Sequence, residues 1–330
     1  MSDALLTAYG AVLLDLDGTV YHGSRGIPGA AEVIGEIREH GTAVRFVTNN
    51  ASKSPAEVAA HLSGLGIPTE PVEVATSAGA AARLLGERLE PGADVLVVGT
   101  ESLADEVRAA GLRPVREAGP GVAAVVQGHS PHTAWPDLAE ACVALRAGAL
   151  WVASNVDATL PTERGQLPGN GSMVAVLRTA TGLEPLVAGK PAAPLLLAAA
   201  EAGGTSGAVV VGDRLDTDIA GATAAGLDAL VVLTGVATPA SLLAAIPAER
   251  PRYLAADLGG LRREADELAI GPRPDWQVKA DGGRLVVTGS GTDPVDLLRA
   301  LCATAWETGH TTCTPGDTQA RAALDELGLL

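Results

Sequence analysis

Aromatic side chains are scarce in this sequence. The 330 residues include four Trp, three Tyr and one Phe, or 2% of the chain. So few rings disfavour a ligand held by stacking, such as a pyridine ring. Basic residues are also few, with 23 Lys and Arg against 39 Asp and Glu, and the net charge is −16. A protein that binds a phosphate backbone needs a basic surface, so we expect no nucleic-acid partner.

Cysteines and long apolar runs are lacking as well. The three cysteines are odd in number and form no Cys-x-x-Cys pair, which argues against a disulfide framework and a thiolate metal site. No apolar run approaches the roughly 20 residues of a membrane span. The first residues, MSDALLTAYG, have no basic segment followed by an apolar stretch and a cleavage site. We therefore expect an unprocessed, cytoplasmic chain without a membrane span.

Short apolar runs alternate with amphipathic segments, and 40 Gly and 21 Pro supply many turns between them. This alternation predicts an α/β fold with a doubly wound parallel sheet. The predicted strands of this series are 11–15, 43–48, 208–213 and 228–233. Its predicted helices are 29–40, 55–65, 191–202 and 216–225.

A second α/β series lies inside the first. Its predicted strands are 94–98, 122–127 and 150–154, and its predicted helices are 101–110, 136–147 and 172–181. We therefore predict a core of residues 1–80 and 185–258, interrupted by an inserted α/β domain of residues 81–184.

The tail reads as a small C-terminal α/β appendage of residues 271–330. A helix-like stretch follows Pro251, and the tail then shows two strands joined by Asp281-Gly282-Gly283, a hairpin turn signal. The predicted tail strands are 275–280 and 284–289, and the predicted helices are 293–308 and 317–328.

Polar residues follow the strands of the first series, where ligands bind in an open parallel sheet. They are Asp15 and Asp17, then Thr48-Asn49-Asn50, and then Asp213 through Asp218. Lys190 begins a helix between these strands. Several carboxylates, one lysine and hydroxyls at one edge indicate a hard divalent cation and a phosphoryl group.

Two familiar motifs fit these residues poorly. A calcium loop needs a third acidic or Asn ligand before its glycine, but Gly18 follows Asp17 directly. A Walker loop needs Gly where Glu184 stands and Ser or Thr where Pro191 stands.

The ordered motifs DLDGTV, VTNN, GKP and GDRLDTDI resemble those of the haloacid dehalogenase (HAD) superfamily of aspartate-dependent phosphotransferases. The insertion between the second and third motifs is similar to the type-two cap of its NagD-like branch, and the resemblance covers about residues 8–258. That branch includes nitrophenylphosphatases and the pyridoxal-phosphate, phosphoglycolate and glycerol-phosphate phosphatases. The resemblance implies a HAD-like Rossmannoid core and phosphatase activity.

The resemblance also implies roles for individual residues. Asp15 is expected to be the nucleophile that forms an aspartyl-phosphate, and Asp17 the general acid and base. Thr48, Asn49 and Lys190 are expected to bind the phosphoryl group. The expected Mg²⁺ ligands are Asp15, the Asp17 carbonyl and Asp213, and Asp218 is expected to orient Lys190 or a metal-bound water. Arg214 stands where many relatives have a second acidic residue. The resemblance therefore does not assign which residue here lies next to the metal ligands.

The substrate is expected to be a small phosphorylated metabolite. Within the predicted cap, Asp157, Leu160 and Glu163 are the residues that could face it. An apolar Leu160 either packs inside the cap or faces the substrate, where it disfavours an aromatic cofactor and is more compatible with a small polyol phosphate. The resemblance implies glycerol 3-phosphate as the substrate, with phosphoglycolate, pyridoxal phosphate or a nucleotide as the alternatives. A non-enzymatic regulatory protein is disfavoured because Asp15, Asp17, Lys190 and Asp213 are all present. A homo-oligomer is left open.

The tail could be an interaction module, a structural brace or a degenerate enzyme domain. Its hairpin and helix are loosely similar to part of an acetyltransferase of the GNAT type. The pyrophosphate-binding loop of that type is missing around Gly289-Ser290-Gly291, so we predict no acetyl transfer.

Overall fold

A computed structural model describes residues 4–162, 164–204 and 207–330. Within it the chain divides into two compact units. Unit 1 combines Met1–Val44 with Gly203–Leu330, and unit 2 is Arg45–Ala202.

Unit 1 contains a parallel sheet whose strands are hydrogen-bonded in the order β15-β14-β13-β1. Leu14 at the end of one strand lies opposite Val211 near the end of its neighbour, so the carboxyl ends of these two strands meet at one edge. Nearly every residue of the four strands is buried, as expected where helices cover both faces of a parallel sheet. The strands are β1 (Ala11–Leu14), β13 (Ala208–Gly212), β14 (Asp228–Val232) and β15 (Tyr253–Ala255).

Short helices surround this sheet. The longest of them, α2, buries Val33, Ile34 and Ile37, the spacing of one helical face. A small hairpin, β2 (Tyr21–His22) with β3 (Arg25–Gly26), follows β1. The helices are α1 (Leu5–Ala8), α2 (Ala30–Glu39), a π-helical turn (Leu215–Ile219), α9 (Ala220–Ala225), α10 (Pro239–Leu243) and α11 (Ala265–Leu268), with 3-10 turns at Pro247–Glu249 and Leu258–Arg262.

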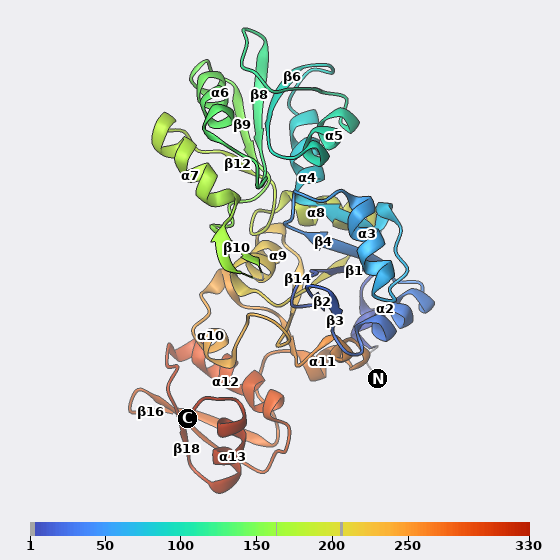
Figure 1. The fold of residues 1–330 in the computed structure, drawn as a ribbon. Coiled ribbons are helices and arrows are strands. Elements are labelled where there is room, and N and C mark those ends of the chain that lie inside the picture. The colour runs from blue at the N-terminus through green and yellow to red at the C-terminus, as the bar shows by residue number, and fades with distance from the viewer. Residues whose placement is uncertain (1–3, 163, 205–206) are drawn as a thin grey trace. The chain divides into compact units, whose positions relative to one another are not determined.

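The tail of unit 1 forms a second, three-stranded sheet (orange to red in Figure 1). The predicted hairpin is present, with Gly282 and Gly283 both at positive φ in its turn. The third strand runs parallel to the second, and two helices pack on the sheet. The elements are β16 (Trp276–Asp281), β17 (Arg284–Gly289), α12 (Pro294–Thr308), β18 (Cys313–Pro315) and α13 (Thr318–Glu326).

A buried arginine joins α12 to the sheet of unit 1. Arg299 is 1% exposed, and its Nε and Nη2 donate to the carbonyl oxygen of Leu254 in β15 at 3.0 and 2.6 Å. Its Nη1 lies 2.5 Å from a carboxylate oxygen of Asp296. The indole N–H of Trp306, also on α12, donates to the carbonyl oxygen of Leu242 at 2.8 Å. The tail therefore packs against the edge of the sheet through specific polar contacts as well as apolar ones.

Unit 2 begins inside β4 (Ala43–Thr48), which pairs in parallel with β5 (Val74–Thr76). Helix α3 starts at a capping box, in which Ser54 and Glu57 each bond the other's backbone N–H, with Pro55 in the first turn. The helices near these strands are α3 (Pro55–Gly64), α4 (Ser77–Gly86) and α8 (Pro194–Ala202), with a 3-10 turn at Pro71–Glu73.

Unit 2 also contains a five-stranded parallel sheet of order β12-β9-β8-β6-β7. Figure 1 shows it in green, with α6 and α7 on one face and α5 on the other. Trp151, Val125 and Leu177 belong to the core under α6 and α7. The elements are β6 (Asp94–Val98), α5 (Glu101–Ala109), β7 (Arg113–Val115), β8 (Val122–Gln127), α6 (Trp135–Arg146), β9 (Leu150–Ala153), the hairpin β10 (Thr159–Thr162) and β11 (Gly165–Pro168), α7 (Asn170–Thr181) and β12 (Leu186–Val187).

The predicted α/β fold class is confirmed, and most predicted elements lie within a few residues of their expected ends. One prediction is wrong: the stretch after Pro251 is not helix-like at its start, because Tyr253–Ala255 forms β15 and pairs with β14. The predicted division into core, cap and tail stays a prediction.

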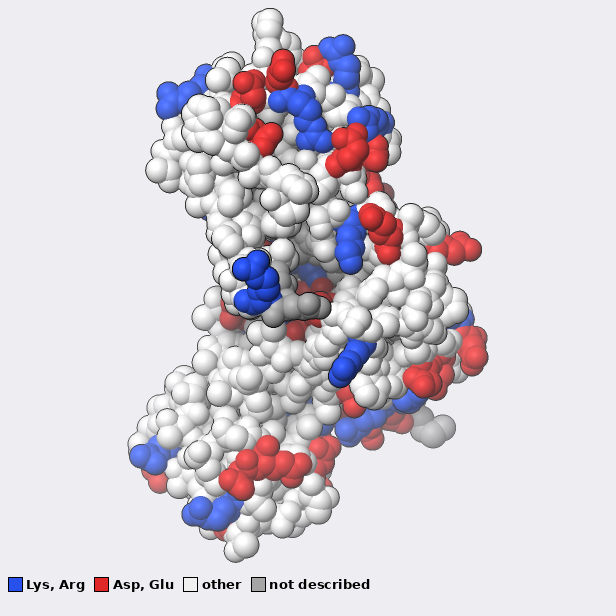
Figure 2. Space-filling model, viewed as in Figure 1, with Lys and Arg blue, Asp and Glu red and all other residues white. Residues whose placement is uncertain are grey.

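The charge distribution on the surface bears on nucleic-acid binding, and the lengths of the helices bear on membrane spans. On the face drawn in Figure 2, basic side chains are scattered among acidic ones rather than gathered into one patch. Among the residues that the structure describes, no helix combines the length and the apolar character needed to cross a membrane.

Candidate active site

Three carboxylates meet at the carboxyl edge of the unit 1 sheet. Asp15 follows β1, Asp213 follows β13, and Asp218 lies in the π-helical turn after β13. One oxygen of each lies within 4.8 Å of the others. Asp213 and Asp218 are each only 1% exposed. The register of β1 with β13 is what brings residues from distant parts of the sequence together here.

The backbone crowds around Asp213. The N–H of Val236 donates to its Oδ2 at 2.7 Å. A Cβ added at Gly18 would lie 2.4 Å from Oδ2, and one added at Gly235 only 1.9 Å from it. Glycine at these two positions therefore lets two loops close over the carboxylate.

Asp17 lies on the turn after β1. The strand ends at Leu14, one residue earlier than predicted, so Asp15 and Asp17 are not two residues of one strand face. The Asp17 side chain is exposed, and Asp15 is half-buried. Burial raises the pKa of Tyr21 above its ordinary value, and the charges of Asp17 and Asp15 raise it further. Both carboxylates therefore act on one phenol, which the sequence analysis did not identify.

The donor set of this cluster fits a hard divalent cation. Carboxylate oxygens are the ligands that Mg²⁺ and Ca²⁺ prefer, and no thiol or imidazole belongs to the cluster. Three negative charges at this spacing repel one another, and a divalent cation offsets that repulsion. The residues present therefore fit the predicted magnesium.

The Arg214 guanidinium pairs with a neighbouring carboxylate. Its Nη2 lies 2.8 Å from Oδ2 of Asp216, and both side chains are substantially exposed. Its backbone N–H donates to Oδ2 of Asp218 at 3.1 Å. The main chain at Arg214 thus helps to fix a carboxylate of the cluster.

Unit 2 carries the predicted phosphate-binding residues. Lys190 is 2% exposed, and its Nζ donates to the carbonyl oxygen of Val47 at 3.3 Å. Thr48 ends β4, and its hydroxyl accepts the N–H of Asn50 at 3.1 Å. The side chain of Asn49 bonds the backbone of Lys190 twice, through Oδ1 at 2.8 Å and Nδ2 at 2.9 Å.

Gly189 allows this arrangement. A Cβ there would lie 2.5 Å from the carbonyl oxygen of Ser154 and 2.6 Å from Oδ1 of Asn49. The peptide bond after Lys190, to Pro191, is cis. The GKP motif therefore presents its lysine from a backbone that only glycine permits at its first position.

The cap residues named from the sequence lie in different places. Asp157 bonds the amide of Asn49. Leu160 lies in β10 and is half-buried. Glu163 lies outside the described residues.

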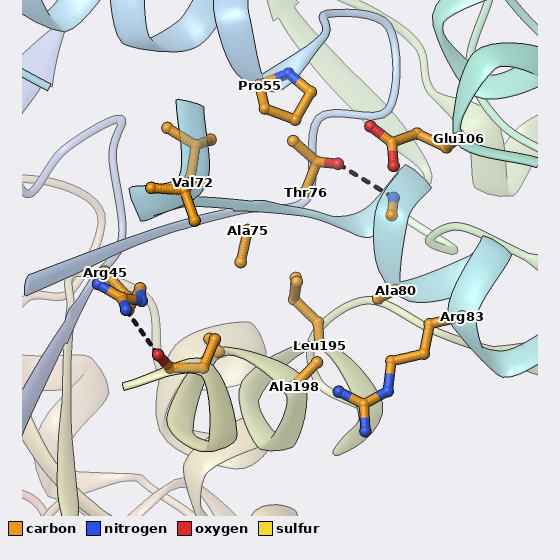
Figure 3. Close-up of a pocket in the computed structure, with 14 residues that line it drawn as sticks. Arg45, Pro55, Val72, Ala75, Thr76, Ala80, Arg83, Glu106, Leu195 and Ala198 are labelled. Carbon is orange, nitrogen blue, oxygen red and sulfur yellow. Dashed lines mark hydrogen bonds between the residues drawn. The ribbon is translucent and has the colours of Figure 1, made fainter. Parts of the chain in front are cut away.

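A cavity of about 170 Å³ in unit 2 lies away from these residues (Figure 3). Arg45 and Glu106 lie toward opposite ends of it, and Leu195 and Ala198 of α8 form part of its wall. The predicted site residues are absent from its lining, so this cavity is not the candidate active site.

Family models match three parts of the chain. A haloacid dehalogenase-like hydrolase model matches residues 12–113, and a second model of HAD-like hydrolases matches residues 187–261. A model of a GCN5-related N-acetyltransferase-like domain matches residues 273–329. With the relatives described next, these matches show that the chain belongs to the haloacid dehalogenase-like hydrolases.

Individual relatives match between 70% and all of the chain. It is 50% identical over 334 residues to the D-glycerol 3-phosphate phosphatase of Mycobacterium tuberculosis, covering 97% of this chain and 94% of that one. It is 36% identical to the 5'-nucleotidase YutF of Bacillus subtilis, covering 70% of this chain and 90% of the relative. A crystal structure of a glycerol phosphate phosphatase from M. tuberculosis with magnesium matches at 50% identity and a TM-score of 0.95, covering 100% of both chains. The predicted phosphatase class is confirmed.

Proposed function

We propose that this chain is a magnesium-dependent phosphatase that hydrolyses glycerol 3-phosphate to glycerol and phosphate. The observation that carries this proposal is the 50% identity to a D-glycerol 3-phosphate phosphatase across both units and the tail. The acidic cluster of unit 1 supports the metal requirement. Phosphoglycolate, pyridoxal phosphate and nucleotides are the alternative substrates, and the 36% identical nucleotidase favours nucleotides among them.

The proposed chemistry proceeds in two steps. The Asp15 carboxylate attacks phosphorus, and the glycerol oxygen leaves with a proton donated by Asp17. Asp17, now ionised, takes a proton from water, and that water attacks the aspartyl-phosphate to release phosphate and restore Asp15. The exposed position of Asp17 at the turn suits a group that exchanges protons with substrate and water.

The remaining proposed roles are metal binding and binding of the phosphoryl group. Asp15, the Asp17 carbonyl and Asp213 would hold Mg²⁺, which supplies positive charge to the phosphoryl oxygens when bound. Asp218 is proposed to act from just outside this set of ligands. Lys190, Thr48 and Asn49 are proposed to hold the phosphoryl group, with Lys190 stabilising charge in the transition state. These local charges offset the long-range repulsion of a chain of net charge −16.

The finer organisation is also proposed. A core of residues 1–80 and 185–258, a cap of residues 81–184 and a tail of residues 271–330 agree with the separate five-stranded sheet and with the acetyltransferase-like match to residues 273–329.

Three free cysteines, two of them buried, agree with a reducing, cytoplasmic compartment. We also propose that the chain can form homo-oligomers, to be tested by its mass in solution.

A substrate panel tests the function. Phosphate release is measured from glycerol 3-phosphate, phosphoglycolate, pyridoxal phosphate and nucleotides, with magnesium and with chelator. The expected result is the highest kcat/KM for glycerol 3-phosphate and no turnover with chelator. A higher kcat/KM for another ester would replace the substrate, and full activity with chelator would contradict the metal requirement.

A further inference from the structure

The side chain of Asn49 holds the backbone of Lys190 on both sides of its Cα. Oδ1 accepts the Lys190 N–H at 2.8 Å, and Nδ2 donates to the Lys190 carbonyl oxygen at 2.9 Å. The two groups lie 141 positions apart in the sequence. A planar amide that makes two such bonds fixes the direction in which the lysine leaves the main chain.

The second N–H of the same amide is directed at Asp157. Nδ2 lies 3.2 Å from Oδ2 and 3.4 Å from Oδ1 of that carboxylate. One donor and two acceptors thus surround Asn49, and this pattern permits only one orientation of its oxygen and nitrogen. Because a hydrogen bond to an ionised acceptor is stronger than one to a neutral acceptor, the carboxylate holds this orientation firmly.

Asp157 is itself held by the residues around it. Its N–H donates to Oδ1 of Asn155 at 3.3 Å, and its carbonyl oxygen accepts the N–H of Gly171 at 2.9 Å. Nδ2 of Asn155 donates to the main-chain oxygen of Asn49 at 2.7 Å. Asn155 therefore links the loop that carries Asp157 to Asn49, the residue whose amide donates to Asp157.

Buried polar side chains continue this network behind the loop. Asn155 and Asn170 are 4% and 2% exposed, and Nδ2 of Asn170 donates to the carbonyl oxygen of Asn155 at 2.7 Å. Both amide atoms of Gln127 and the hydroxyl of Ser154 are buried without a hydrogen-bond partner in the part of the chain that the structure describes. Apolar side chains would pack there at less cost, so the polar composition is not explained by packing.

We propose that Asp157 is a positioning residue for Lys190, acting through the amide of Asn49. This inference rests on the proposed function, in which Lys190 binds the phosphoryl group. The phosphoryl group is common to every phosphate ester, so a loss of this contact should lower turnover equally for all substrates. A residue that touches the leaving group would instead affect each substrate differently.

The test compares Asp157→Ala with Asp157→Asn, which keeps an acceptor oxygen. With glycerol 3-phosphate and p-nitrophenyl phosphate, we expect Asp157→Ala to lower kcat/KM about tenfold for both esters, the effect of one lost hydrogen bond. Asp157→Asn should lose less than about threefold. In an Asn49→Ala background, Asp157→Ala should add no further loss, because the connection is already broken.

A binding measurement separates this proposal from the proposed function. Calorimetry with inorganic phosphate and magnesium should show Kd raised about tenfold by Asp157→Ala and little by Asp157→Asn. Phosphate binding can be measured even if the wild-type chain hydrolyses neither ester. A failure to hydrolyse both esters would overturn only the proposed function. A wild-type Kd and a wild-type kcat/KM for Asp157→Ala, or a loss confined to one ester, would overturn the positioning role.

Discussion

Gly18 approaches Asp213 so closely that a Cβ on the glycine would lie 2.4 Å from the carboxylate oxygen Oδ2. Gly18 also has a φ of +92°, which L side chains rarely adopt. Two independent constraints therefore act on one residue of the DLDGTV motif. One comes from the local turn after β1, and the other from a carboxylate almost 200 positions later.

The first prediction separates these constraints. Gly41 has a φ of +80° with nothing within 4 Å of an added Cβ, so Gly41→Ala should cost only the strain of its backbone, about 1–2 kcal/mol. Gly18→Ala should cost at least twice as much, because the methyl group also displaces Asp213. Urea unfolding of both variants measures the difference. Equal losses in the free energy of unfolding for the two variants would show that Asp213 can move away from the added methyl group without cost.

The nucleophile is tested by Asp15→Asn. The variant should lose turnover at least about 10³-fold, since an amide cannot take over the attack on phosphorus. Its thermal midpoint should remain within a few degrees of wild type. Asp216→Asn is the matched control, because that carboxylate is exposed and pairs with Arg214. Near-normal activity of Asp15→Asn would assign the nucleophile to another residue.

Metal binding is tested through stability rather than turnover. Magnesium at 100 times its Kd should stabilise the wild-type chain by about 2.7 kcal/mol, because it binds only the folded cluster. Asp213→Asn removes one of the three carboxylates and should abolish most of this gain. Differential scanning calorimetry with and without magnesium gives the answer. An unchanged gain in the variant would exclude Asp213 as a ligand.

Glu106 gives a prediction for pH. Burial, with a smaller contribution from Asp105, raises the pKa of this carboxyl group above its ordinary value of 4.5. The folded state therefore binds the proton more tightly than the unfolded state, and stability falls as pH rises through the folded pKa. Glu106→Gln should match wild type near pH 4 and be more stable than wild type at pH 7.

The control for this prediction lies on the same helix. Arg108 and Arg116 lower the pKa of Glu101, so its ionised form favours folding. Glu101→Gln should therefore be less stable than wild type above about pH 4.5, and this difference should shrink as the pH falls below that value, the opposite sign. Thermal midpoints measured from below pH 4 up to pH 8 follow both trends. The same sign in both variants would contradict the assignment.

The attachment of the tail is tested at Arg299. Arg299→Met removes two hydrogen bonds to Leu254 and leaves Asp296 without this partner, so it should cost about 3 kcal/mol. Arg321 is exposed on α13, and Arg321→Met should change the free energy of unfolding by less than about 0.5 kcal/mol. A small cost at Arg299 would show that its hydrogen bonds contribute little to holding the tail.

Short apolar runs between turn residues made much of the fold predictable. The strands 43–48, 94–98 and 122–127 were predicted with the ends they have, because continuous Val, Ala and Leu runs between turn residues suit buried parallel strands. Tyr253–Ala255 was missed because three residues carry no periodicity, and pairing with β14 decides their conformation. The β10–β11 hairpin was missed for a related reason, since Pro and Gly within it weaken any strand signal.

The candidate site was predictable in part for the same reason. Asp15 and Asp213 directly follow strands, so their meeting followed from the expectation of a parallel sheet. The bonds of Asn49 to Lys190 and Asp157 were not predictable, because they depend on loop geometry between residues more than 100 positions apart. Tyr21 was missed because a single tyrosine in a two-residue strand has no distinguishing pattern.

The pairing of β1 with β13 sets an order of events during synthesis. Ala11 lies opposite Ala208, so the ribosome must add about 200 residues before β1 gains this neighbour. At 5–20 residues per second, that interval is roughly 10–40 s. Unit 2 is continuous in the sequence and is complete before β13 has been made. For that time the edge of β1 that pairs with β13 stays open, and an open apolar strand edge is a site at which another chain can pair.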